Sequence, residues 1–242
     1  MRVSAKSDVG AVRSNNQDCC LAGEFANGET WAIVCDGMGG ANGGNIASET
    51  AIKTISEKIV NGYHVGMNDN SVKHLIVSAI EAANATIYSK SRNDESLKGM
   101  GTTVVIAIIK GDALYFAHVG DSRLYIVTKD SINQMTTDHS VVQMMIDNGE
   151  ISRDEAKDHP QKNVITRALG VDDSIRIDYC QESFNDGDIV LLCTDGLTNF
   201  VEESRIFEIC NKYDPFLLSD VLIDEAIASG GGDNVTVITV TD

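Results

Sequence analysis

The apolar positions of this 242-residue chain follow two patterns, one with the period of a β-strand and one with the period of an α-helix. Short runs rich in Val, Ile and Tyr, bounded by Gly, Asn or Asp, are typical of strands. We expect residues 102–128 to form an antiparallel meander, because the turn Lys110-Gly111-Asp112 joins two such runs. The predicted strands are Val3–Ser7, Cys19–Gly23, Trp31–Cys35, Thr102–Ile109, Ala113–Val119, Arg123–Thr128, Ile175–Cys180, Ile189–Thr194 and Val235–Val240.

Apolar residues spaced three and four apart predict helices, which come in two pairs. The first helix follows a glycine-rich turn, Asp36–Gly44, and stops just before Gly62. The second helix has Asn70 or Ser71 as its predicted N-cap. The later pair spans about 202–211 and 215–229. Each of these helices has an apolar face, so each must cover an apolar surface.

The order of these elements indicates the fold class. Strands, two helices, strands, two helices and a last strand follow one another, and paired helices disfavour a parallel βαβ fold. We therefore predict an α+β fold, a four-layer α-β-β-α sandwich with two central, mostly antiparallel sheets. Residues 1–242 form a single predicted domain, because the chain has no linker or internal repeat. A polar, weakly helical stretch at about 141–165 is predicted to be a surface excursion, or flap.

Composition excludes several classes of protein. With 43% hydrophobic and 23% charged residues, the chain is too apolar for a disordered protein. Its net charge of −17 disfavours binding to nucleic acid or to an anionic membrane, whereas excess carboxylate suits a hard cation. The start of the chain has no secretory signal, and no apolar run is long enough to span a bilayer. The six cysteines include no C-x-x-C pair, so we expect reduced thiols in a cytoplasmic protein. We also expect the protein to be a monomer.

The aspartates that end apolar strands are the most informative chemical feature. Asp36 and Asp195 each end an apolar run and precede a glycine, Asp121 follows a third run, and Asp233 precedes the last strand. Any one of them is explained by an ordinary surface turn. Four together, in a chain with 19 basic residues, favour a shared site for Mg²⁺ or Mn²⁺, because oxygen ligands without matching His or Cys do not suit zinc.

The glycine-rich loop after Asp36 is not a dinucleotide fingerprint. After Gly37 and Gly39 the third glycine is due at position 42, which is Asn. A phosphate bridged by a metal fits this loop better, and the carbonyl of Gly37 can itself be a ligand. Arg13 lies before Asp18 in the sequence, and its guanidinium is either an ion-pair partner or a group that binds phosphate.

Covalent hydrolase chemistry has no candidate in this sequence. No cysteine is followed by Arg six positions later, and the Asp-x-Asp-Gly, Gly-x-Ser-x-Gly and His-Glu-x-x-His patterns are absent. The five histidines lack metal-ligand spacing, so we interpret them as packing or surface residues.

The motifs taken together resemble the metal-dependent PPM (protein phosphatase 2C) family of Ser/Thr phosphatases, in particular its compact bacterial members. The resemblance covers essentially the whole chain, and eight weak motifs in sequence order make it specific. The motifs are Arg13-x-x-x-x-Asp18, Asp36-Gly-Met-Gly-Gly40, Gly99-Met-Gly-Thr-Thr103, His118-Val-Gly-Asp-Ser-Arg123, Asp138-His-Ser140, Thr166-Arg-Ala-Leu-Gly170, Thr194-Asp-Gly196 and Gly232-Asp-Asn234.

The resemblance implies hydrolysis of phosphoserine and phosphothreonine in proteins by a water held between two Mn²⁺ or Mg²⁺ ions, without a covalent intermediate. It assigns Asp36, Asp195, Asp233 and the carbonyl of Gly37 to the two core ions, and Asp121 to a third ion. Arg13 would bind the substrate phosphate, and Asp18 would act through bound water. The expected partners are phosphorylated proteins and a cognate Ser/Thr kinase.

Two positions depart from the family pattern. Met38 and Ala41 stand where relatives carry a histidine linked to protonation of the leaving group, so metal-bound water is the alternative general acid. Two other functions stay open at this point. One is a regulatory binding module of the same fold without catalysis, and the other is an acidic cation-binding protein without activity.

Overall fold

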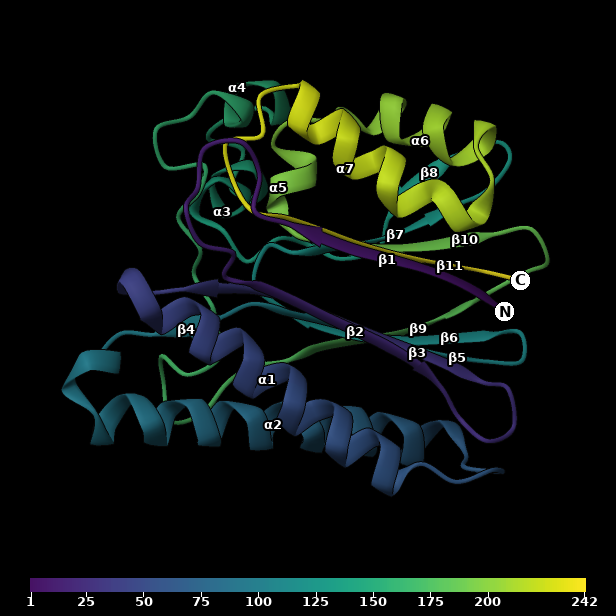
Figure 1. The fold of residues 1–242 in the computed structure, drawn as a ribbon, viewed down its shortest axis with the longest axis horizontal. Helices are drawn as coiled ribbons and strands as arrows, with labels where there is room; N and C mark the ends of the chain where they lie inside the picture. The colour runs from purple at the N-terminus through teal and green to yellow at the C-terminus, as the bar shows by residue number, and fades with distance from the viewer.

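The computed structural model describes residues 1–242, except for the side chains of Ala41 and Asn42, and has four layers (Figure 1). Helices α1 (Gly40–Gly62) and α2 (Asp69–Asn93) form one outer layer. Helices α6 (Glu203–Lys212) and α7 (Leu218–Ala228) form the other outer layer. Two antiparallel sheets lie between them, so the predicted α-β-β-α sandwich is confirmed.

The sheet beside α6 and α7 has the strand order β1-β11-β10-β7-β8, with every neighbouring pair antiparallel. The first and last strands of the chain are therefore paired, and both termini lie at the same end of the molecule (Figure 1). The strands are β1 (Arg2–Asp8), β7 (Arg123–Val127), β8 (Ile132–Gln134), β10 (Ile189–Cys193) and β11 (Val235–Thr241).

The sheet beside α1 and α2 has the order β2-β3-β5-β6-β9 and is also antiparallel, with the short strand β4 paired to β3. Its strands are β2 (Asp18–Glu24), β3 (Thr30–Met38), β4 (Gly101–Thr102), β5 (Val104–Lys110), β6 (Ala113–Val119) and β9 (Asp178–Ser183).

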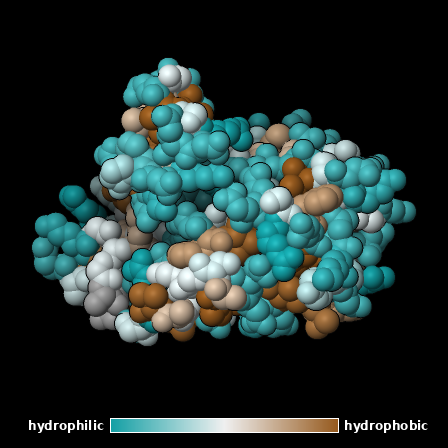
Figure 2. Space-filling model, turned by 90° about the horizontal axis from the view of Figure 1, so that it is seen from above, coloured by the Kyte–Doolittle hydropathy of each residue, from teal (hydrophilic) through white to brown (hydrophobic). Residues whose placement is uncertain are grey.

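Three apolar layers hold the sandwich together, and alternating side chains of each central strand serve two of them. On β3, Ile33 packs toward α1 and α2, while Val34 packs into the layer between the sheets. On β10, Leu191 packs toward α6 and α7, while Leu192 faces the other sheet. Burial on both faces explains why these strands are continuous apolar runs. Hydrophilic residues cover most of the outer face above α6 and α7 (Figure 2).

The predicted three-strand meander is wrong in its last strand. Strands β5 and β6 do form a hairpin, but β7 pairs with β10 in the other sheet. The chain crosses between the sheets through residues 120–122, where Gly120 has φ 109°, in the region that favours glycine. The apolar pattern of β7 fits either sheet, so the pattern could not reveal the crossing.

Several element boundaries also differ from the prediction. The glycine-rich turn after β3 is short, because α1 already begins at Gly40. Helix α2 begins earlier than predicted, with Asn68 as the N-cap accepting a hydrogen bond from the backbone N–H of Ser71. Strand β9 begins at Asp178, and Ile175 packs on the core from outside the strand. The sequence did not predict β4, β8 or the short helix α5 (Asp195–Thr198).

The segment at about 141–165 forms two short helices, α3 (Val141–Asp147) and α4 (Arg153–Lys157). Its ends are tied together, because the backbone N–H of Val141 donates to the carbonyl of Val164. In the described chain, no helix combines the length and apolar character needed to cross a bilayer.

Candidate metal and phosphate site

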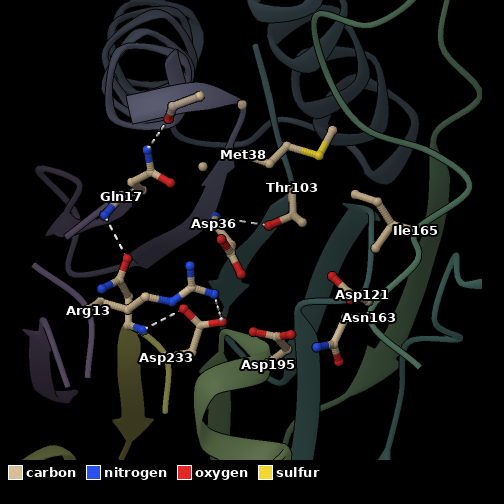
Figure 3. A pocket seen from close by; sticks show the side chains of 14 residues that line it. Arg13, Gln17, Asp36, Met38, Thr103, Asp121, Asn163, Ile165, Asp195 and Asp233 are labelled. Carbon is tan, nitrogen blue, oxygen red and sulfur yellow. Dashed lines mark hydrogen bonds and ion pairs between the residues drawn. The ribbon is translucent and has the colours of Figure 1, made fainter. Parts of the chain in front are cut away.

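A cavity of about 390 Å³ lies at the end of the sandwich away from both termini, near α5. Four aspartates and Arg13 line it, with Arg13 and Asp121 on opposite sides (Figure 3). The lining also includes the predicted ligand Gly37. The four aspartates are Asp36, Asp121, Asp195 and Asp233.

The ends of strands bring these carboxylates together. Asp36 lies near the end of β3 and Asp121 lies in the crossing between β6 and β7. Asp195 is the first residue of α5, directly after β10, and Asp233 lies two residues before β11. Because these ends of the two sheets meet at one end of the sandwich, residues far apart in sequence share one cavity.

Two glycines allow this close approach of backbones. A Cβ on Gly37 would lie 2.1 Å from the carbonyl oxygen of Gly44, and a Cβ on Gly196 would lie 1.8 Å from the carbonyl oxygen of Asn234. Both distances are far below any real Cβ contact. The Asp-Gly pairs are therefore not ordinary surface turns, because any side chain at either glycine would clash with a neighbouring backbone segment.

The electrostatics of the site disfavour four free carboxylates. Burial raises the pKa of Asp36 well above its usual range, and the charges of Asp18 and Asp195 raise it further. Burial, followed by the charge of Asp195, raises the pKa of Asp121 to about 8. Burial also raises the pKa of Asp195, and Asp233 adds to the effect. A cation within the cluster would remove this penalty.

Asp18 lies behind the cavity and not on its lining. It faces Asp36 directly across β2 and β3. Its Oδ2 accepts hydrogen bonds of 2.8 Å from the hydroxyls of Thr194 and Thr236. Its Oδ1 is buried and has no hydrogen-bond partner among the described residues. Burial raises the pKa of Asp18 to about 7, although the two hydroxyls oppose the rise.

The unpartnered Oδ1 of Asp18 provides a test of whether the residues fit a divalent ion. A buried carboxylate oxygen without a partner is unfavourable unless a cation or an ordered water lies beside it. Hard divalent cations prefer carboxylate and carbonyl oxygens, which are the donors that Asp18, Asp36, Asp195, Asp233 and Gly37 offer. The residues present therefore fit a site for Mg²⁺ or Mn²⁺.

Arg13 lies at the rim of the cavity, where its Nη2 donates to Oδ2 of Asp233 at 2.9 Å. Its side chain is 56% exposed, so part of the guanidinium is open to solvent. The ion-pair alternative is therefore observed, and the exposed part of the fork leaves donors for an anion at the mouth of the cavity.

Some residues of the site were missed by sequence reasoning. Asn234 accepts from the backbone N–H of Gln17 and donates to the carbonyls of Val9 and Asn15, so it ties down the loop that carries Arg13. Thr103 accepts from the backbone N–H of Asp36 at 2.9 Å. Both residues belong to family motifs, Thr103 to Gly99–Thr103 and Asn234 to Gly232–Asn234, and membership of these motifs could have marked them as site residues. From the flap, Asn163 and Ile165 also reach the cavity, and no pattern marked them.

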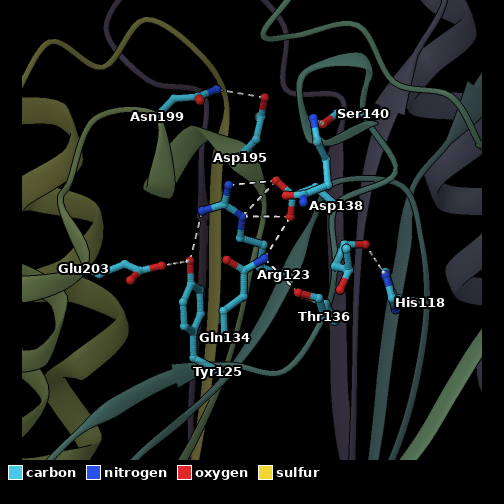
Figure 4. A network of polar contacts seen from close by, with 12 residues as sticks. His118, Arg123, Tyr125, Gln134, Thr136, Asp138, Ser140, Asp195, Asn199 and Glu203 are labelled. Atoms are coloured by element: carbon cyan, nitrogen blue, oxygen red, sulfur yellow. Dashed lines mark hydrogen bonds and ion pairs between the residues drawn. The ribbon is translucent and has the colours of Figure 1, made fainter. Parts of the chain in front are cut away.

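A partly buried ion pair supports the cavity from behind (Figure 4). The guanidinium of Arg123 makes a two-pronged contact with Asp138, with Nε to Oδ1 at 2.9 Å and Nη2 to Oδ2 at 2.7 Å. It also donates to the hydroxyl of Tyr125. The positive charge of Arg123 lowers the pKa of Asp121 and of Asp195, and so opposes the rise that burial causes.

Two histidines lie outside the cavity in a cluster that geometry alone would allow to hold a metal. His118 and His139 stack at 4.6 Å, and their nitrogens lie near the carboxylate of Asp178. The guanidinium of Arg167 already occupies this cluster, 2.9 Å from Asp178 and 3.0 Å from His139. Burial lowers the pKa of His139 to about 4.

The fold and the cavity define a class of protein. An α-β-β-α sandwich that carries clustered aspartates and one arginine at a single end is typical of metal-dependent phosphatases, which is what the sequence motifs implied.

The chain belongs to the protein phosphatase 2C family, whose profile matches residues 11–221. It is 38% identical over 245 residues to the protein phosphatase PhpP of Streptococcus pneumoniae, an alignment that covers 100% of this chain and 97% of PhpP. The structure of the serine/threonine phosphatase of S. agalactiae aligns with a TM-score of 0.93 and 34% identity, covering 100% of this chain and 99% of that one. The protein is therefore an enzyme, a Ser/Thr phosphoprotein phosphatase.

A third comparison bears on the metal. The catalytic domain of the serine/threonine phosphatase PstP was solved in complex with two manganese ions, and it aligns with a TM-score of 0.86 and 31% identity, covering 100% of this chain and 98% of that one. Metal dependence is a property of the family.

Proposed function

We propose that this enzyme removes phosphate from phosphoserine and phosphothreonine in proteins at a centre of two divalent ions, Mn²⁺ or Mg²⁺, with a third ion beside Asp121. The observation that carries the proposal is the cavity in which four aspartates converge in front of the unpartnered Oδ1 of Asp18. The carboxylates cluster despite a strong electrostatic penalty, which a bound cation would remove at neutral pH.

Each residue then has a role that follows from its place. Asp36, Asp195, Asp233 and the carbonyl of Gly37 would hold the two core ions, with Asp36 between the two sides of the cavity (Figure 3). Asp18 would support this centre from behind, through bound water. When bound, such ions supply a nucleophilic water near neutral pH and neutralise charge on the phosphoryl group.

Arg13 orients the substrate phosphate at the mouth of the cavity. Its free N–H groups face solvent beside Asp233, so an incoming phosphate can accept from the guanidinium without displacing a buried group. Arg13 would neutralise charge on the phosphoryl oxygens from the rim, opposite the residues that would hold the metal ions. No covalent intermediate is needed, because a divalent-ion centre would supply water as the nucleophile.

The leaving group needs a proton donor, and here the two departures from the family pattern matter. Met38 lines the cavity and cannot donate a proton. The side chain of Ala41 lies outside the described residues, and alanine has no proton to give. We infer that water protonates the leaving oxygen. A cytoplasmic location, a monomeric state, a single catalytic domain and a cognate Ser/Thr kinase as partner stay predictions.

The test is the hydrolysis of phenyl phosphate and of a phosphothreonine peptide with Mn²⁺, with EDTA, and for Asp195→Ala. We expect turnover that requires the metal and falls to background in Asp195→Ala, because the variant removes a ligand of a core ion. Asp130→Ala, which removes an exposed aspartate on the β7–β8 turn, is the matched control and should retain activity. Tight Mn²⁺ binding by the wild type without turnover would instead support the non-catalytic binding module.

A further inference from the structure

Asp18 is held by hydroxyl groups from the opposite sheet. Asp18 is the first residue of β2, whereas Thr236 lies on β11 and Thr194 follows β10. Both threonines are fully buried. On β11, residues 238 and 240 are apolar and pack in the layer between the sheets. Thr236 lies on the same face of β11, at the end of the strand next to the cavity. Its hydroxyl therefore interrupts an apolar face at the point where the carboxylate of Asp18 lies.

The hydroxyl hydrogens of this cluster are donated toward Asp18, either directly or through Thr236. Thr194 Oγ1 accepts from the backbone N–H of Thr236 at 3.0 Å and donates to Oδ2 of Asp18. Thr236 also donates its single hydroxyl hydrogen to Oδ2. The contact of 2.7 Å between Ser7 and Thr236 must then be donated by Ser7, whose own oxygen accepts from Nδ2 of Asn16.

This arrangement divides the two oxygens of Asp18 between two tasks. Oδ2 receives both hydroxyls and is saturated by the opposite sheet. Oδ1 is buried without a partner among the described residues, beside the charges of Asp36, Asp195 and Asp233. The carboxylate cannot rotate to exchange its oxygens without breaking two hydrogen bonds of 2.8 Å.

We propose that Thr194 and Thr236 are positioning residues that fix the carboxylate plane of Asp18, so that Oδ1 alone faces the divalent-ion centre. The inference rests on the proposed function. Groups that orient metal ligands through hydrogen bonds typically change metal affinity strongly when they are removed, because the freed ligand must be ordered again on binding. Loss of either hydroxyl therefore weakens metal binding although neither threonine touches the ion.

The experiment measures Mn²⁺ binding by isothermal titration calorimetry on metal-stripped protein, for wild type, Thr194→Val, Thr236→Val and Thr236→Ser. Valine keeps the shape of threonine without the hydroxyl, and serine keeps the hydroxyl. We expect each valine variant to bind Mn²⁺ about tenfold to hundredfold more weakly. Thr236→Ser should bind like the wild type, because it restores the donor.

Thr239→Val is the matched control. Thr239 lies on the same strand and is buried, and its hydroxyl has no partner among the described residues. We expect it to bind Mn²⁺ like the wild type. Chemical denaturation of all variants without metal separates affinity from stability, because a merely structural pair would lower stability and leave the affinity of the folded protein unchanged.

The outcomes separate this inference from the proposed function. If the wild type binds Mn²⁺ and turns over substrate while Thr194→Val and Thr236→Val keep its affinity, the positioning role is overturned and the proposed function stands. Equal loss in Thr236→Ser and Thr236→Val would also overturn the role of the hydroxyl. If the wild type itself binds no Mn²⁺, the proposed function fails, and this inference fails with it.

Discussion

At the scale of single residues, Asp18 and Asp36 show how the same side chain takes different tasks on paired strands. They are direct partners across β2 and β3. Asp36 lines the cavity, and Thr103 holds its backbone N–H. Asp18 lies behind, and two threonine hydroxyls hold one of its oxygens. The surroundings supplied by the fold, not the residue type, separate a candidate bridging ligand from a supporting one.

The first prediction concerns protonation of the leaving group. Because no histidine lines the cavity among the described residues, the wild type should hydrolyse phenyl phosphate much faster than alkyl phosphates, whose leaving groups need a proton more. Ala41→His should raise the alkyl phosphate rate by about 100-fold, the lower end of the usual contribution of a positioned general acid. The measurement is the ratio of the phenyl phosphate rate to the alkyl phosphate rate for each variant. Ala41→Gln, of similar size but without a titrating group, is the control, and an unchanged ratio in Ala41→His would contradict the prediction.

At the scale of elements, the Arg123–Asp138 pair links the start of β7 to the segment that leads into the flap. Arg123 follows the crossing residue Asp121, and Asp138 precedes α3. The pair is mostly buried, with side chains 26% and 12% exposed. Gln134 also donates to Asp138, so the carboxylate has donors from two elements. The pair thus ties the start of β7 to the segment before α3, beside the cavity (Figure 4).

The second prediction follows from this pair. Asp138→Asn keeps the shape but removes the charge, leaving the guanidinium of Arg123 without its counter-ion. We expect a loss of about 2 kcal/mol in the free energy of unfolding, in the range for hydrogen bonds to charged groups. Glu95→Gln, which breaks the exposed Lys98–Glu95 pair, should change stability little. Urea denaturation of the two variants compares them, and equal effects would argue against the structural role of Asp138.

At the scale of the whole molecule, an excess of negative charge surrounds a site for an anionic substrate. The net charge is −17, and the cavity itself is rich in carboxylates. An enzyme with this charge binds a phosphate group only where cations reverse the local field. Divalent ions bound in the cavity would therefore decide where on the surface a phosphorylated protein can be accepted.

The third prediction is the pH dependence of the metal-free protein. Asp18 and Asp121 have pKa values of about 7 and about 8, above the value of an unfolded chain. Their folded forms therefore hold protons that the unfolded chain releases, so the stability of the metal-free protein falls as pH rises from about 4 to about 8.

Thermal unfolding in EDTA between pH 5 and 8 should show a midpoint that falls by several degrees. With Mn²⁺ the trend should reverse, because metal binding requires deprotonated ligands and is favoured at higher pH. Asp121→Asn should make the fall in EDTA shallower, since it removes one of the titrating groups. A midpoint that rises with pH in EDTA would show that these carboxylates are ionised without metal.

The sequence determined most of the local structure. Continuous apolar runs and three-to-four spacing are properties of neighbouring residues, so most strands and all four long helices were predictable. The aspartates at strand ends were visible for the same reason, and the order of the motifs indicated the family.

Only the tertiary structure decided how these parts meet. Strand β7 pairs with β10 in the sheet beside α6 and α7 and does not extend the β5–β6 hairpin, the flap brings Asn163 into the cavity, and Arg123 meets Asp138 behind it. The hydroxyl of Thr236 reaches Asp18 across 218 positions of sequence. No local pattern encodes such contacts, because they depend on which sheet edges and layers pack together once the whole chain has folded.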